Sequence, residues 1–132
     1  MPDAAEIYGI VFQKASATLL ARVLGADGNP ITPSQITAAR YSVALIDDED
    51  PTSLSPVSGH WEVPLTPSAV VLATLQKDAL WDVDEIGYNF RHILDVTQAP
   101  AFPEAQRTYR IEYRLTPQTG QQIVVRFRVR AI

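Results

Sequence analysis

The sequence predicts an all-β fold, an antiparallel β-sandwich that ends in a C-terminal hairpin. Three observations lead to this prediction. Ten prolines are spread over the 132 residues, and proline disfavours long helices. Several segments alternate apolar and polar residues with a period of two, and turn residues separate these segments. The length and the hydrophobic content of 46% are typical of one globular domain.

The first two expected strands of the sandwich are residues 17–24 and 39–46. The earlier one ends in Gly-Ala-Asp-Gly-Asn-Pro, a turn sequence in which Gly28 and Asn29 accept a positive φ. The later one alternates large apolar residues with Arg40, a serine and an alanine, so one face is apolar.

A long polar segment, residues 47–59, interrupts the strands. A loop of this length in a compact domain is either functional or mobile. Two short strands are expected after it, at residues 60–65 and 68–75. In the first of these, Pro64 favours an edge or a bulge, and in the second a Val-Val pair favours a strand over a short helix.

The last three expected strands alternate most clearly. Residues 88–94 have Tyr88, Phe90, His92 and Leu94 on one face. Residues 108–115 and 121–131 are joined by Thr-Pro-Gln-Thr-Gly, in which proline fixes φ and glycine allows a positive φ. These two segments predict the C-terminal hairpin.

The hairpin carries five arginines opposite its apolar stripe, namely Arg110, Arg114, Arg126, Arg128 and Arg130. The net charge is −4, yet residues 107–132 hold 6 arginines against Glu112, and residues 1–106 hold 5 basic against 14 acidic residues. Two interpretations remain open: a solvated sheet face, or a contact face for an acidic partner surface. Nucleic acid is disfavoured, because the hairpin aromatics fall on the other face and stacking needs them beside the charges.

Residues 1–16 precede the domain expected over residues 17–132. They form either an arm that adds to a neighbour's sheet or simply a first strand. The N-terminus has no basic segment, so we expect no secretory signal peptide, and no apolar run is long enough to span a bilayer. The expected location is cytoplasmic, with no membrane partner.

No pattern of a catalytic, cofactor or metal site is found, so we expect a protein that is not an enzyme. Cysteine is absent, which excludes thiolate chemistry. His60 and His92 lack the spacing of a metal pair, and His92 is expected at the core edge with one nitrogen satisfied. The acidic segments at residues 47–50 and 82–87 are interpreted as solvated loops, with calcium as the alternative. No Gly-x-Ser-x-Gly or phosphate-binding loop occurs.

Aromatic residues are expected in the core. Trp81 in particular should pack beside the strand at residues 88–94. The alternative is a glycan- or peptide-binding module in which Trp61, Trp81 and the loop at residues 47–59 form a binding platform.

The run Trp-Asp-Val-Asp-Glu-Ile-Gly-Tyr-Asn-Phe at residues 81–90, followed by a Tyr-rich strand and a terminal hairpin, resembles immunoglobulin-like β-sandwich modules of the kind found in tailed-phage virion proteins. The early strand followed by Asp-Gly-Asn-Pro-Ile-Thr is also similar to the opening of such modules, and the likeness covers residues 17–131. The usual cysteine pair is absent, and the spacing from Asp84 to Tyr88 is not that of a tyrosine corner.

This resemblance implies a non-enzymatic structural protein, a virion decoration, neck or tail accessory subunit. Such a subunit would bind neighbouring protein subunits in a homo- or hetero-oligomeric assembly.

Overall fold

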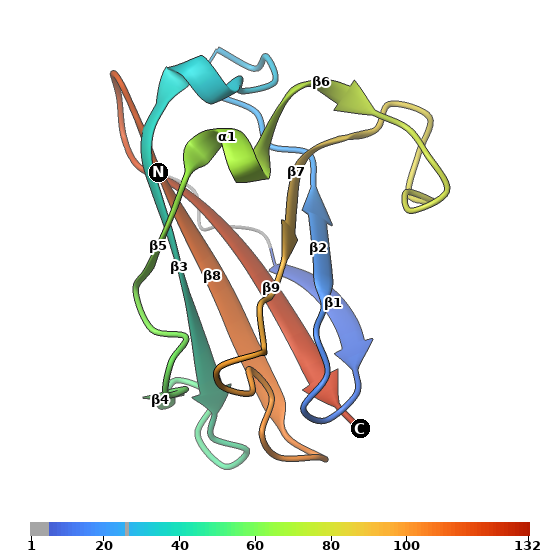
Figure 1. Cartoon of the computed structure of the whole chain (residues 1–132), viewed down its shortest axis with the longest axis vertical. Coiled ribbons are helices and arrows are strands. Elements are labelled where there is room, and N and C mark those ends of the chain that lie inside the picture. Colours follow the sequence, from blue (N-terminus) through green and yellow to red (C-terminus); the bar gives the residue numbers. More distant parts are fainter. Residues whose placement is uncertain (1–5, 26) are drawn as a thin grey trace.

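The computed structural model describes residues 6–25 and 27–132 and contains two β-sheets that pack against each other as a sandwich (Figure 1). The larger sheet has six strands in the order β1-β9-β8-β3-β4, with β5 also paired to β3, and the smaller sheet has the order β2-β7-β6. The strands are β1 (Glu6–Val11), β2 (Thr18–Ala21), β3 (Ile36–Ile46), β4 (Leu54–Pro56), β5 (Val63–Leu65), β6 (Val71–Gln76), β7 (Tyr88–Ile93), β8 (Thr108–Pro117) and β9 (Ile123–Ala131). The predicted all-β sandwich is confirmed.

The predicted C-terminal hairpin is also confirmed. Strands β8 and β9 pair antiparallel from Thr108↔Arg130 to Leu115↔Ile123. Each inward-facing residue of β8 is 0% exposed, because the smaller sheet covers this face: Tyr109, Ile111, Tyr113 and Leu115. Strand β3 pairs with the other edge of β8 over nearly its whole length, which makes β8 the central strand of the larger sheet.

Strand β1 departs from the antiparallel expectation. It runs parallel to β9 in the register Gly9↔Val129, and the ladder continues with Ile132 N–H donating to the Val11 carbonyl at 2.9 Å. The described part of the N-terminal segment therefore forms a first strand on this chain's own sheet. Residues 1–5, which the arm alternative included, lie outside the described residues.

Most predicted strands differ by a few residues from those in the structure, and three of the differences have a clear local cause. Strand β2 ends at Ala21 because Val23 bonds the buried side chain of Asn89, whose Oδ1 accepts from Val23 N–H at 2.7 Å. The predicted strand at residues 68–75 is wrong in its first part, where Pro67 begins a single helical turn, α1 (Pro67–Val70), ahead of β6. Strand β5 starts only after Glu62, whose φ of 52° breaks an extended backbone.

The core lies between the two sheets and is rich in aromatic side chains. Phe90 packs on Tyr113 with ring centroids 4.8 Å apart, and Trp81 packs on Tyr88 at 5.6 Å, which confirms the predicted position of Trp81. Trp61 is an exception to the expectation of buried aromatics, because it is 47% exposed in the loop before β5. Neither described helix, α1 or η1 (Pro33–Gln35), has the length and apolar composition needed to cross a membrane.

Candidate functional site

The outer face of the larger sheet gathers six arginines from three adjacent strands. Register places Arg40 of β3 opposite Arg114 of β8, and Arg110 of β8 opposite Arg128 of β9. We name this surface the arginine face and define it by Arg40, Arg110, Arg114, Arg126, Arg128 and Arg130. The strand alternation that buries Tyr109 and Ile111 turns these arginines outward.

Glu112 lies at the centre of the arginine face and binds two of its members. Its carboxylate accepts from Arg126 Nε at 2.7 Å and from Arg114 Nε at 2.9 Å, and its side chain is only 14% exposed. Burial alone would raise the pKa of Glu112, but the hydrogen bonds from Arg126 and Arg114 lower that pKa below its ordinary value. Glu112 therefore stays ionised and keeps both guanidinium groups in place.

The remaining positive charge of the arginine face is not neutralised by this one acid. Within the described part of the chain, Arg40, Arg110 and Arg130 form no ion pair, and the buried Nε of Arg110 has no hydrogen-bond partner. Like charges directly opposite one another on adjacent strands destabilise a sheet. The arrangement thus holds a concentrated positive charge at some cost to folding stability.

The structure brings together all five arginines that the hairpin alternation predicted. It adds Arg40, which the sequence placed on the polar face of its strand without indicating that this strand lies beside the hairpin. The aromatic residues of the hairpin are buried on the opposite side, with Tyr113 at 0% and Phe127 at 3% exposure. Within the hairpin, the arginine face therefore has charge without an aromatic ring beside it.

The two acidic segments hold their own loops together. In the first, Asp47 Oδ1 accepts from the backbone N–H of Glu49 at 2.8 Å, which closes a turn at the end of β3. Among the described residues, no three His, Asp or Glu side chains lie together in a way that could hold a metal ion.

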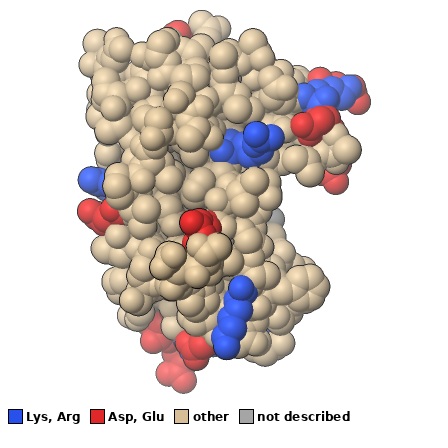
Figure 2. Space-filling view, in the orientation of Figure 1, with Lys and Arg blue, Asp and Glu red and all other residues tan. Residues whose placement is uncertain are grey.

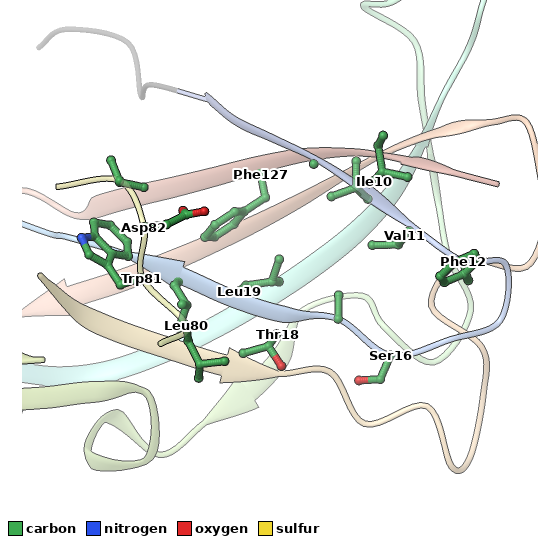
Figure 3. Close-up of a pocket in the computed structure, with 15 residues that line it drawn as sticks. Ile10, Val11, Phe12, Ser16, Thr18, Leu19, Leu80, Trp81, Asp82 and Phe127 are labelled. Carbon is green, nitrogen blue, oxygen red and sulfur yellow. The ribbon is translucent and has the colours of Figure 1, made fainter. Parts of the chain in front are cut away.

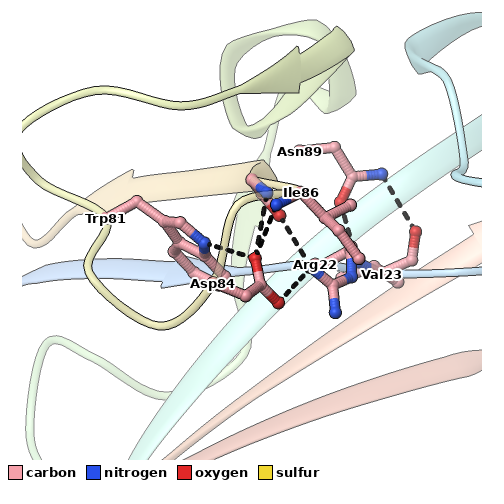
Figure 4. Close-up of polar contacts among 7 residues, drawn as sticks. Arg22, Val23, Trp81, Asp84, Ile86 and Asn89 are labelled. Atoms are coloured by element: carbon pink, nitrogen blue, oxygen red, sulfur yellow. Dashed lines mark hydrogen bonds and ion pairs between the residues drawn. The ribbon is translucent and has the colours of Figure 1, made fainter.

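The second acidic segment is fastened by Asp84 (Figure 4). Its carboxylate accepts from Trp81 Nε1 at 3.0 Å, from Arg22 at 2.6 Å, and from the backbone N–H groups of Ile86 and Gly87 at 3.0 and 3.1 Å. These donors lower the pKa of Asp84 far below its ordinary value, and the hydrogen bond from Trp81 has the largest effect. The acidic segment for which calcium was the alternative therefore has a structural role: Asp84 ties the β6–β7 loop (residues 77–87) to Arg22 at the end of β2.

Two histidines and two tyrosines form a polar cluster inside the sandwich. The Ala99 carbonyl accepts from His60 Nε2 at 2.8 Å, and His60 Nδ1 shares a hydrogen bond with the Tyr41 hydroxyl, also at 2.8 Å. His92 Nδ1 bonds the Tyr113 hydroxyl at 2.7 Å, which confirms the prediction of a core-edge histidine with one satisfied nitrogen. Burial and the neighbouring His60 lower the pKa of His92 to about 4.

The proposed aromatic platform is not assembled. Trp61 lies in the loop that precedes β5, whereas Trp81 lies in the β6–β7 loop. The β6–β7 loop projects from one end of the molecule, and the loop that follows β3 lies at the other end (Figure 1).

Figure 2 shows few charged side chains on the face in view and a hollow beside the projecting β6–β7 loop.

The chain matches no protein-family model, no curated protein and no solved structure.

Proposed function

We propose that this protein is a non-enzymatic interaction subunit whose arginine face binds an acidic surface on a neighbouring protein. The observation that carries the proposal is the row of opposed arginines, Arg40 with Arg114 and Arg110 with Arg128, on the strands that surround the bound acid Glu112. A sheet face that only needed solvation would gain stability from alternating charges. Arginine also forms forked hydrogen bonds that fit carboxylates.

A protein partner fits this surface better than a nucleic acid does. Non-specific binding of single strands relies on aromatic rings beside the charges, and here those rings are buried in the core. The chain as a whole is acidic, with a net charge of −4, so it would be repelled by a polyanion everywhere except at the arginine face.

We also propose that the sandwich is immunoglobulin-like. The order β2-β7-β6 facing β9-β8-β3-β4 corresponds to strands B-E-D facing G-F-C-C′. The hydroxyl of Tyr109, at the start of β8, accepts from Glu104 N–H at 2.9 Å, which is the geometry of a tyrosine corner before strand F. The spacing from Asp84 to Tyr88 is not that of a tyrosine corner, and the hydroxyl of Tyr88 instead donates to Asp78 at 2.8 Å.

The setting we propose is a phage or phage-like virion, in which the subunit decorates or joins other subunits. The sequence resemblance to virion modules supports this setting. Particles purified from the source of the chain should contain it in a fixed ratio to the major subunits. Recovery of the chain only in the particle-free fraction would count against a virion role while leaving the arginine face open to another acidic protein.

The interaction itself is tested by two variants of equal charge. Arg40→Gln with Arg110→Gln removes two arginines that form no ion pair in the described residues, and Lys77→Gln with Arg91→Gln removes two cations elsewhere. Acidic proteins captured from the source are purified and titrated against each variant by calorimetry.

The arginine variant should bind at least about tenfold more weakly, since each lost contact to a carboxylate is worth about 1 kcal/mol or more. The control variant should bind like the unmodified chain, and binding should weaken steeply with added salt. Equal affinity of the two variants, or binding that salt does not affect, would show that the arginine face is only a solvated surface.

A further inference from the structure

A groove of about 370 Å³ lies between β1 and β2, which are edge strands of the two sheets, and is closed at one end by the β6–β7 loop (Figure 3). Phe127 and Val129 of β9 and Leu19 of β2 line its apolar interior. Gly9 opens the groove, because a Cβ at this position would stand 3.7 Å from Val129 and would begin to fill it. The same region is the hollow seen in Figure 2.

The rim of the groove exposes large apolar side chains. Phe12 is 69% exposed, Leu80 58% and Val83 71%. Ile10 is 72% exposed on the other face of β1, beside Arg130. At about 200 Å² for a large apolar side chain, the three rim residues expose on the order of 400 Å² of apolar surface. This matches the largest patches found on monomeric proteins, which are often functional.

Strand β1 also leaves one backbone edge open. It is the first strand in the sheet order, and no described strand pairs with its outer side. Natural edge strands are protected by lysines, prolines, bulges or covering loops. The segment Glu6–Val11 contains no lysine and no proline, so its edge is suited to pairing with another strand.

We propose that this groove and the β1 edge bind a second copy of this chain, by antiparallel pairing of the two β1 strands about a two-fold axis. A two-fold contact uses the same patch twice, so each copy covers the other's exposed apolar rim. A stable interface buries about 800 Å² on each partner, and the apolar rim alone supplies about half of this area.

Charge complementarity supports a second copy as the occupant. Phe12 lies at one end of the groove, and Trp81 and Asp82 lie at the other (Figure 3). Antiparallel pairing therefore brings Phe12 of one copy to the Trp81–Asp82 end of the other copy. Lys14 follows Phe12 by two residues, and neither Lys14 nor Asp82 forms an ion pair within the described part of the chain. Two symmetric Lys14–Asp82 pairs then flank an apolar centre, as in many interfaces.

The contact is tested by measuring the solution mass with light scattering over a hundredfold range of concentration. The mass should rise from that of the 14.6 kDa chain to twice this value, and the dimer should persist at high salt because its centre is apolar. Ile10→Lys should give a monomer at every concentration. The matched control Ile93→Lys changes a residue on β7 that is 60% exposed and does not line the groove, and it should dimerise like the unmodified chain.

Two further variants keep the test independent of folding defects. Gly9→Val fills the groove without a backbone clash and should also give a monomer with an unchanged melting temperature. Lys14→Asp should weaken dimerisation about tenfold, and adding Asp82→Lys should restore it.

A monomer at all concentrations, or equal masses for the two lysine variants, would overturn the proposal. A dimer that dissociates with salt would also overturn it and would point instead to the arginine face.

Discussion

Acid should destabilise this protein well above the pH at which its carboxylates titrate, because His92 is held neutral in the sandwich. The ring bonds the Tyr113 hydroxyl and lies 5.0 Å from the Tyr41 ring. Its pKa falls from 6.5 to about 4, through burial and the proximity of His60. Between these two values the unfolded chain binds a proton that the folded chain excludes, so stability is lost as the pH falls through this window.

The size of the effect follows from the two pKa values. Full linkage would cost about 2 kcal/mol between pH 7 and pH 5. The His92 side chain is only partly buried, so solvent screening reduces this cost to about 1 kcal/mol. The carboxyl groups of Asp84 and Glu112, whose pKa values are lowered, remain ionised throughout this range and add nothing to it.

Urea unfolding at pH 7, 6 and 5 and constant ionic strength measures the loss in free energy of unfolding. His92→Asn keeps a polar atom near the position of Nδ1 but does not titrate, so the loss should shrink to a few tenths of a kcal/mol in this variant. Equal free energies of unfolding at pH 7 and pH 5 in the unmodified chain would refute the reasoning. So would a loss that persists undiminished in the variant, because the titrating group would then lie elsewhere.

Four substitutions test other parts of the fold. Tyr109→Phe removes the hydroxyl that bonds Glu104 and should cost about 1–2 kcal/mol in urea unfolding; a change below about 0.5 kcal/mol would mean that water replaces the hydroxyl. In Gly87→Ala, at φ +106°, the added Cβ would overlap the backbone at the end of β6, and the substitution should cost more than about 3 kcal/mol. Gly120→Ala, at φ +95° in open space, should cost only about 1 kcal/mol. Similar melting temperatures for the two variants would contradict the clash at Gly87. Glu112→Gln should cost about 1–2 kcal/mol at low salt and less at high salt, since it leaves arginine repulsion unbalanced; a cost independent of salt would argue against repulsion.

Local alternation made the hairpin predictable. Strands β8 and β9 each bury every second residue, β8 ends at Pro117, and the turn that follows contains Gly120 with a positive φ. Strand β1 could not be placed in the same way, because its partner β9 lies more than a hundred residues along the chain and runs parallel to it. The end of β2 could not be predicted either, because the side chain of Asn89, distant in the sequence, replaces a backbone partner for Val23.

The candidate site was predictable in composition but incomplete. The spacing of the hairpin arginines placed five of them on one face. The sixth, Arg40, joins them only through the long-range register of β3 against β8, which no local pattern encodes. The groove was not predictable, because it depends on two edge strands and on the missing side chain of Gly9.

The pairing of β1 with β9 also has a consequence for synthesis. Strand β1 is made before the other strands of the sandwich, and its neighbour β9 is made last of them. At roughly 5–20 residues per second, the nascent chain therefore waits on the order of ten seconds before the larger sheet can be completed. During that wait Phe127 is missing, so Phe90 and Tyr113, which pack on it in the finished core, stay uncovered. Nascent chains on crowded polysomes would be most exposed to aggregation at this stage, and chaperones that bind short apolar segments would have their best opportunity to act there.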